Sequence, residues 1–376
     1  MMRLKDLTAS GYTFEEMVGG NFLYVDKTEF LWRLLAPSKG LYFLSRPRRF
    51  GKSLTISTLK AVFQNKRHLF KGLALDTKQF EWKEHPVIHL DLADRPSETA
   101  ERLDANLVIA LNEAAAPLGV TLQERRAPER FRELVLKAAA GGRKVVVLID
   151  EYDKPILDNI TSPEIEAIRS VMEDFYSVVK ATEPHLRFAL LTGVSKFAKV
   201  SLFSTLNNLA DLSMDERFAT ALGYTQEELE ANFAPYLDEV AARRKLTRDE
   251  LRDKLRLWYN GYRFHPDAAT VYNPVSIAKF LDSGGEFKNF WFETGTPRFL
   301  IELLKRNDYD LGSLETTELG EEDFSSYEIE HIQVLPLLFQ TGYLTIAKAE
   351  ERRGSWRYTL GFPNREVRES FNHRLF

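Results

Sequence analysis

The stretch that most restricts the fold is residues 144–149, which has the sequence KVVVLI. Four of its six residues are β-branched, and the apolar side chains follow one another without alternation. A run of this kind predicts a strand that is buried on both faces. Such strands belong to parallel sheets that helices cover on both sides, so the run predicts an α/β fold.

Strands and helices are predicted to alternate over the first ~215 residues, by periodicity and by helix stop signals such as Gly141-Gly142. The expected strands are 40–44, 86–90, 144–149 and 188–193, and the expected helices are 53–63, 98–116, 128–140 and 163–180. This alternation is typical of a parallel sheet with helices on both faces.

The segment SRPRRFGKSLT, residues 45–55, lies between the first strand and the first of these helices. It ends like a phosphate-binding loop of the pattern G-x-x-x-x-G-K-[ST]. Gly51 would permit close backbone approach, Lys52 would reach the β- and γ-phosphates, and Ser53 would be a Mg²⁺ ligand. Arg46 stands where the pattern has its first glycine. The alternative for the motif alone is a chance match with Lys52 as a surface cation.

The sequence does not distinguish the roles of the three arginines in this loop. Pro47 restricts Arg46 to extended geometry, which would give the loop a different entry. Arg46, Arg48 and Arg49 could contact phosphate, pair with acids, brace the loop or face a partner.

Two acids follow the most buried strand directly. Asp150 is placed to hold Mg²⁺, and Glu151 is placed to orient or activate an attacking water. The alternative is an ordinary pair of loop acids. Because a phosphate-binding motif and an acidic strand end occur in the right order and context, we interpret them together as a nucleotide site.

The strand that ends in Leu190-Leu191-Thr192 brings a hydroxyl to the carboxyl edge of the sheet, which faces the ligand in open α/β folds. Thr192 could sense the γ-phosphate or position the attacking water, against the alternative of an ordinary strand-end threonine. Ser195 and Lys196 are weaker candidates.

After about residue 220 helices dominate the prediction. Residues 241–258 are expected to form one charged helix with a solvated face, and the acidic stretch 314–330 a solvated connector. Other expected features are a helix start at Thr225, a turn at Asn260-Gly261, a helix from Asn273-Pro274, a hairpin of 343–346 with 357–360, and a last helix from Pro363.

Composition excludes several classes of protein. The chain has no cysteine, so it has no disulfide, no cysteine zinc site and no thiol catalysis. Its formal net charge of −4 excludes a uniformly basic nucleic-acid binder. Since it lacks a run of 18 apolar residues and an apolar N-terminal signal core, we expect a cytoplasmic protein without a membrane partner.

The sequence resembles the AAA-ATPase-like proteins of bacteria and archaea, which are often fused to a C-terminal PD-(D/E)XK nuclease-like domain. In that family the arginine-rich loop without its first glycine is the expected form. The blocks that carry the resemblance are FLYVDKTEFL (22–31), FLSRPRRFGKSLT (43–55), VVVLIDEYDKPI (145–156), LLTGVSKFAKVSLFSTLNNLADLSMD (190–215), WYNGYRF (258–264), VYNPVSI (271–277) and FWFETGTPRFLIELL (290–304).

The resemblance implies an α/β fold with a P-loop NTPase core of the AAA type and a mostly helical or winged-helix-like lid. We expect the core at 1–218, the lid at 219–362 and a linker helix at 363–376, leading toward a domain that this chain lacks. No nuclease activity is expected, since the one tempting fragment, Asp76 with Glu81-Trp82-Lys83, lies in the wrong region.

The resemblance also implies ATP and Mg²⁺ as ligands, with residues 24–30 near the base. Arg263 and Arg298 are candidates for a lid arginine that contacts the γ-phosphate, although pairing of each with an acid is favoured. The catalytic candidates are Glu151, Lys52 and Thr192, the metal ligands are Ser53 and Asp150, and the nucleotide-binding residues are Arg48, Arg49, Phe50, Gly51, Lys52, Ser53 and Leu54.

The favoured function is an ATP-binding and ATP-hydrolysing switch or motor that acts on an unknown protein or nucleic acid. The alternatives are a non-catalytic ATP-binding scaffold and a nucleic-acid-binding module that uses the arginine-rich loop. Homo-oligomer formation is left open.

Overall fold

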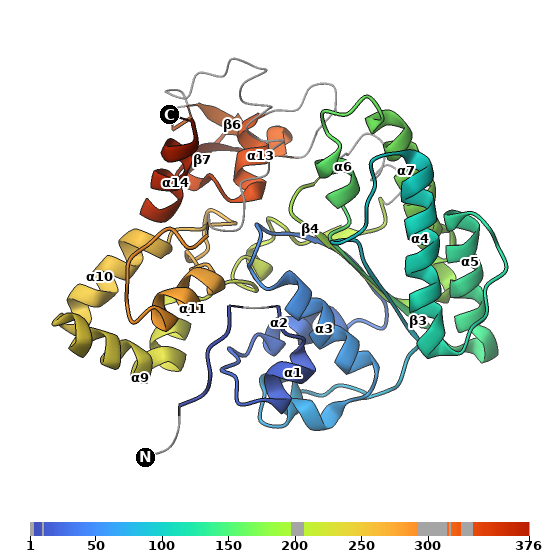
Figure 1. The fold of residues 1–376 in the computed structure, drawn as a ribbon, viewed down its shortest axis with the longest axis horizontal. Coiled ribbons are helices and arrows are strands. Elements are labelled where there is room, and N and C mark those ends of the chain that lie inside the picture. Colours follow the sequence, from blue (N-terminus) through green and yellow to red (C-terminus); the bar gives the residue numbers. More distant parts are fainter. Residues whose placement is uncertain are drawn as a thin grey trace.

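The computed structural model describes residues 4–9, 11–196, 207–291, 314–315, 317–324 and 334–375. Its centre is a five-stranded sheet with strand order β2-β3-β4-β1-β5, in which each neighbouring pair is parallel (Figure 1). The strands are β1 (Gly40–Ser45), β2 (Val87–Asp91), β3 (Val145–Asp150), β4 (Leu186–Gly193) and β5 (Ala210–Asp211).

Strand β3 is buried along its whole length, as its unbroken apolar sequence predicts. In the sheet, Val147 lies between Ile88 of β2 and Ala189 of β4. The strand that most restricted the sequence-based prediction is therefore confirmed as a central strand.

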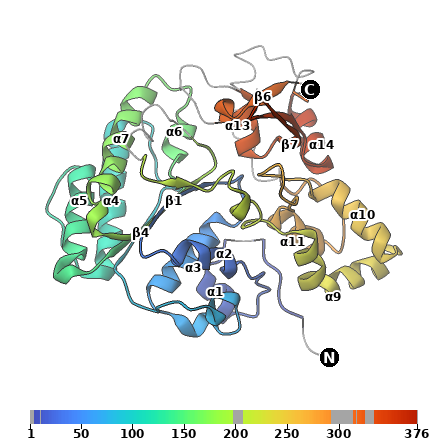
Figure 2. The ribbon, with the colours of Figure 1, turned by 180° about the vertical axis from the view of Figure 1, so that it is seen from behind.

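Helices cover the sheet on both sides (Figures 1 and 2). Helix α3 packs against β2, β3 and β4, and α4, α5 and α7 pack on one another in a separate layer. The helices of this part of the chain are α1 (Phe14–Gly19), α2 (Thr28–Leu35), α3 (Lys52–Phe63), α4 (Ala100–Ala115), α5 (Ala127–Ala138), α6 (Lys154–Asp158) and α7 (Ile165–Ala181).

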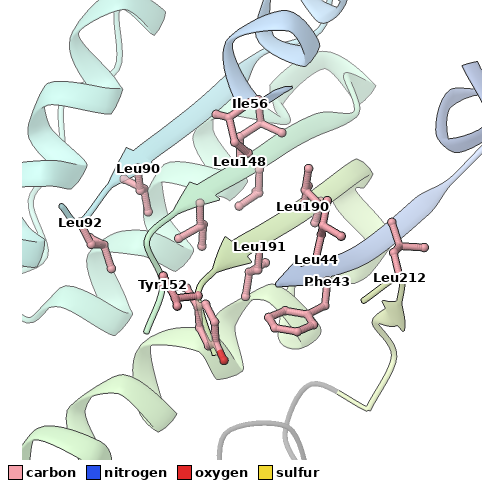
Figure 3. Close-up of a cluster of buried hydrophobic side chains, with 14 of the residues drawn as sticks. Phe43, Leu44, Ile56, Leu90, Leu92, Leu148, Tyr152, Leu190, Leu191 and Leu212 are labelled. Carbon is pink, nitrogen blue, oxygen red and sulfur yellow. The ribbon is translucent and has the colours of Figure 1, made fainter. Parts of the chain in front are cut away.

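The core lies between these layers. Figure 3 shows Leu148 and Leu190 of the central strands beside Ile56 of α3, with Tyr152 beyond the end of β3. These side chains are almost fully removed from solvent, and burial of each leucine contributes about 2 kcal/mol of transfer free energy. The packed core fixes the strand ends that carry the polar residues described below.

A second group of helices follows the sheet: α9 (Gln226–Arg244), α10 (Arg248–Tyr259) and α11 (Pro274–Asp282). They have a hydrophobic core of their own, which includes Phe233, Leu255 and Phe280. Val25, from the segment that precedes α2, belongs to this second core as well. The helix start expected at Thr225 is confirmed, because Thr225 and Glu228 form a capping box.

The single helix expected over 241–258 is wrong. Helix α9 ends at Lys245, which has a left-handed backbone conformation, and α10 begins after Thr247. Thr247 and Glu250 form a capping box, a helix-start signal that is present in the sequence. The charges of these helices form surface ion pairs, such as Arg243 with Glu239, as a solvated face requires.

The last part of the chain forms a small antiparallel sheet in the order β6-β8-β7. Its elements are β6 (Glu318–Gly320), α13 (Val334–Thr341), β7 (Thr345–Arg352), β8 (Ser355–Gly361) and α14 (Arg365–Leu375). The expected hairpin is confirmed as β7 and β8. In the described part of 314–330 the expected solvated connector is wrong, because Leu319 and Phe324 are buried and β6 pairs with β8.

Helix α14 is the expected last helix, and its Val367 and Phe371 are buried in the folded unit. The whole arrangement is an α/β parallel core followed by helices and a small antiparallel sheet, so the expected fold class is confirmed. The domain boundaries at 218 and 362, and the role of the last helix as a linker, stay predictions.

Across the residues that the structure describes, no helix has the length and apolarity to cross a membrane.

Candidate functional site

The loop after β1 leads directly into the N-terminus of α3. Gly51 is the residue before the helix and has φ = 95°, a left-handed conformation that favours glycine. No side chain caps this helix, whereas Thr13, Thr225 and Asn273 cap α1, α9 and α11. An uncapped helix start presents backbone N–H groups and the positive end of the helix dipole, which together suit a phosphate.

Lys52 is the first residue of α3 and is buried. Its Nζ donates hydrogen bonds to the carbonyl oxygens of Arg46 (3.0 Å) and Pro47 (3.1 Å). The ammonium group is therefore held inside the curve of the loop rather than at the surface. Ser53, the next residue, is exposed on the first turn of α3.

Arg46 does not face a ligand. Its side chain is 1% exposed, and its guanidinium donates to the carbonyl oxygens of Ser45 (2.9 Å), Ser213 (2.7 Å) and Phe218 (2.9 Å). It also lies over the ring of Phe264, 4.2 Å from the ring centre. Of the roles left open for it, bracing of the loop is the one that these contacts support.

Phe50 is buried as well, and its ring packs edge-on against Tyr262 (4.9 Å) and Phe264 (5.6 Å). Its side chain therefore joins the loop to the WYNGYRF segment. Arg48 and Arg49 are partly exposed in the same loop, and Arg49 has φ = 69°. The carbonyl oxygen of Arg48 accepts a 3.4 Å hydrogen bond from Asn273 Nδ2.

Asp150 and Thr192 meet at the carboxyl edge of the sheet. Thr192 Oγ1 donates a 2.6 Å hydrogen bond to Asp150 Oδ1, and both residues are buried. The same oxygen accepts from the backbone N–H of Glu151 (3.0 Å). The structure thus brings together the acid of β3 and the hydroxyl of β4, two candidates that are 42 positions apart in the chain.

Glu151 is partly exposed beside this pair and has φ = 52°. A positive φ is costly for a residue with a side chain, and such strain is concentrated at functional sites. The loop after β1 lies next to these residues, because Arg46 N donates to the carbonyl oxygen of Gly193 (3.1 Å).

A cavity of about 90 Å³ adjoins the start of α3. Gly51 and Leu54 line it from the loop side, and Tyr24 and Phe30 line it from the segment for which the resemblance implied contact with the base. Its lining is mostly apolar, so a flat ring with little charge is the group that it suits.

Ser195 and Lys196 are committed to protein contacts: Ser195 to Asp153, and Lys196 to Asp211 through an ion pair. Arg263 is half-buried, and within the described part of the chain its Nε has no hydrogen-bond partner. The pairing of Arg263 with an acid and its role as a lid arginine both stay predictions. Arg298 lies outside the described residues.

Asp153 is the residue that the sequence-based prediction missed. It is fully buried, and its carboxylate accepts hydrogen bonds from the backbone N–H groups of Val194 and Ser195. Burial, and next the charge of Glu151, raise the pKa of Asp153 to about 6. The signal for it was present as the third acid of the segment DEYD, residues 150–153.

The residues fit a nucleotide that carries Mg²⁺. This ion usually takes one or two carboxylates and keeps phosphate oxygens and waters as its other ligands. A buried carboxylate at Asp150, a hydroxyl at Ser53 and an uncapped helix start are a set of that kind. Within the described residues no cluster of three or more histidine, aspartate or glutamate side chains forms a self-contained metal site.

Comparison with known proteins gives a family match. The model of a family described as predicted AAA-ATPase, AAA-ATPase_like, matches residues 11–203. An uncharacterized protein in the vnfD 5′ region of Azotobacter chroococcum mcd 1 is 42% identical over 380 residues, covering 100% of this chain and 70% of that protein.

Three solved structures show weaker likeness over nearly the whole chain. The first is the Aeropyrum pernix ORC1 protein in complex with DNA, with a TM-score of 0.34 and 15% identity over 93% of each chain. The second is the Aeropyrum pernix ORC2 protein in ADPNP–ADP complexes, with a TM-score of 0.35 and 13% identity over 93% of this chain and 91% of that one. The third is Cdc6p from Pyrobaculum aerophilum, with a TM-score of 0.31 and 11% identity over 96% of this chain and 99% of that one. Scores of this size assign no ligand or partner to this chain.

Proposed function

This chain belongs to the family of predicted AAA-ATPases, and we propose that it binds ATP at the start of α3 and hydrolyses it with the help of Mg²⁺. The observation that carries the proposal is the meeting of two elements. The uncapped start of α3, with the buried Lys52, adjoins the sheet edge where Thr192 donates to Asp150.

Each residue has a proposed role. The backbone N–H groups of residues 48–54 bind the phosphates, and the Lys52 ammonium binds the β- and γ-phosphates. Ser53 and Asp150 hold Mg²⁺, which when bound neutralises charge on the phosphate oxygens. The cavity beside Tyr24, Phe30 and Leu54 receives the base.

Glu151 orients the water that attacks the γ-phosphorus and accepts its proton. Its partly exposed carboxylate can reach a water at the edge of the sheet, whereas Asp150 is buried and already accepts two hydrogen bonds. Thr192 holds Asp150 in place through its hydroxyl. In this scheme Thr192 contributes by fixing the metal-binding carboxylate rather than by contacting water itself.

Replacement of Lys52 by alanine tests the binding site. We expect Lys52→Ala to weaken ATP binding by about 100-fold or more, because it removes a buried ammonium that offsets phosphate charge. Titration calorimetry with ATP and Mg²⁺ measures the affinity. Lys60→Ala, on the same helix, is the control and should bind like the parent protein. Unchanged affinity of Lys52→Ala would refute the site.

The same preparations test turnover. Phosphate release should stop on chelation of Mg²⁺ with EDTA and should fall by about 100-fold or more in Glu151→Gln, while ATP binding by that variant is kept. An unmodified chain that binds ATP and releases no phosphate, with DNA or without it, would instead support a non-catalytic scaffold. The nucleic-acid alternative loses one of its three arginines, because the Arg46 guanidinium is buried against carbonyl groups.

A further inference from the structure

Asp153 is the residue directly before α6, but its side chain does not cap that helix. Although it precedes the helix, its side chain makes no hydrogen bond to the helix backbone. It turns instead toward the end of β4, where Oδ2 accepts from Val194 N (3.0 Å), Ser195 N (2.6 Å) and Ser195 Oγ (2.6 Å). Three donors converge on this one oxygen, and a charged carboxylate oxygen is a stronger acceptor for them than the neutral carbonyl oxygen of an amide.

The neighbouring residue Tyr152 holds the same stretch of backbone. Tyr152 N donates to the carbonyl oxygen of Thr192 (3.0 Å), and its hydroxyl donates to that of Ser195 (2.9 Å). Gly193 fits between them because it has no side chain: a Cβ there would lie 2.4 Å from Asp153 Oδ1 and 2.5 Å from the Tyr152 ring. Residues 192–195 are therefore held at several points by the turn that follows β3.

Burial is the largest influence on the pKa of Asp153, and charged groups around it act in both directions. Glu151 opposes ionisation of Asp153, Lys52 of α3 favours it, and the ionisation of Tyr176 of α7 is itself opposed by Asp153. The Asp153 carboxylate thus interacts electrostatically with Lys52, which binds phosphate in the proposed function, and with Glu151, which orients the attacking water.

Residues 192–195 also connect the candidate site to another part of the molecule. Directly after Ser195, the backbone N–H of Lys196 donates to Gln340 Oε1 of α13 (2.8 Å). Gln340 is buried, and α13 belongs to the C-terminal unit with the small antiparallel sheet. A short series of hydrogen bonds therefore runs from Asp153 through residues 195 and 196 to α13.

We propose that Asp153 is a positioning residue, whose carboxylate fixes the end of β4 against the turn after β3 and so holds Thr192 and Glu151 in register for phosphoryl transfer. This role rests on the proposed ATPase function. The same contact ties the carboxyl edge of the sheet to α13 through Lys196 and Gln340. Asp153 does not touch the reacting groups and acts through the backbone that it binds.

Asp153→Asn tests the proposal. The variant keeps the size of the side chain but removes its charge and places an amide nitrogen where Oδ1 faces Val194 N, so the end of β4 is held less firmly. We expect kcat to fall by about 10- to 100-fold, with the dissociation constant for ATP within about threefold of the parent. Asp158→Asn, on the exposed face of the same short helix, is the control and should leave both values unchanged.

Ser195→Ala is a milder second variant, because it removes a single donor and adds no new group. We expect it to lower kcat by about three- to tenfold with unchanged ATP affinity. Normal turnover of both variants would overturn the positioning role. A loss of ATP affinity equal to the loss of kcat would also overturn it, because it would mark a general defect in folding.

Hydrogen exchange separates failure of this proposal from failure of the proposed function. If the unmodified chain does not turn over ATP, the function fails, but the contact can still be measured. Asp153→Asn should then lose protection at residues 192–196 and in the last turn of α13, and keep it in β3. Unchanged protection in those segments would refute the positioning role by itself.

Discussion

At the scale of single residues, Arg46 explains how this loop can lack its first glycine. Its guanidinium donates to three carbonyl groups that lie within the protein, from two nitrogen atoms whose directions the planar group fixes. Burial lowers the pKa of Arg46 to about 9, so the group stays charged at neutral pH. The loop is thus fixed by a side chain at the position where the common pattern relies on a flexible backbone.

Arg46→Met should lower the free energy of unfolding by about 2–4 kcal/mol, because it removes the guanidinium donors of three buried carbonyl groups, of which only that of Phe218 is shown to keep a second donor, Ala221 N. Urea unfolding followed by circular dichroism measures the change. Arg143→Met, at an exposed arginine, is the control and should change the value by less than about 0.5 kcal/mol. A loss below about 1 kcal/mol for Arg46→Met would mean that the bracing contacts contribute little.

At the scale of secondary-structure elements, helix α11 connects to the phosphate-binding loop through its cap. Asn273 is fully buried, and its Oδ1 accepts from Val275 N (3.0 Å) and Ser276 N (3.3 Å). Its Nδ2 donates to the carbonyl oxygen of Arg48. One side chain thus begins α11 and touches the loop.

Asn273→Ala should cost about 1–2 kcal/mol of stability, since it removes the cap. Asn273→Asp keeps the cap acceptor and removes the donor to the loop, so it should cost less than Asn273→Ala in thermal unfolding. If both variants lose the same amount, the loop contact rather than the cap carries the effect. If neither loses stability, the cap does not matter here.

The elements that the sequence predicted well are those with strong local signals. The strands 86–90, 144–149 and 188–193 are buried apolar runs, and the helix start at Thr225 has a capping box. The break between α9 and α10 was missed because periodicity and charge continue across Lys245, although Thr247 and Glu250 signalled a new start. Strand β6 is three residues long and is defined by its pairing with β8, which local sequence does not contain.

The candidate site also has some residues that the sequence could predict and others that it could not. The motif around Lys52 and the acids at 150 and 151 could be found from spacing, because phosphate chemistry requires them in that order. The burial of Arg46 and the contacts of Asp153 depend on residues more than 40 positions away, so spacing carries no signal for them. The roles assigned to all these residues stay predictions until they are measured.

At the scale of the whole molecule, the segment before α2 joins the helical region α9–α11 to the sheet. Lys27 Nζ donates to the carbonyl oxygen of Thr220 (2.9 Å) and to Glu228 (2.6 Å) in the first turn of α9. Burial lowers the pKa of Lys27, and Glu228 opposes that effect. The early segment, which also lines the cavity beside Gly51, is thereby fixed to the helical region.

Lys27→Met should lower the free energy of unfolding by about 1–2 kcal/mol, because it removes a partly buried ion pair. It should also raise hydrogen exchange in the first turn of α9. Lys66→Met breaks a more exposed pair with Glu15 and is the control, with an expected loss below about 0.5 kcal/mol. Equal effects of the two changes would show that Lys27 does not connect the two regions.

The membership of Val25 in the hydrophobic core of α9–α11 has a consequence for biosynthesis. That core also contains Phe290, which the ribosome adds more than 250 positions later. At a usual elongation rate this interval lasts roughly 10–50 s. The parallel sheet can assemble within that time, while the segment around Val25 waits for a partner that has not yet been made. Chaperones that bind exposed apolar chain would therefore meet this protein first at its early residues.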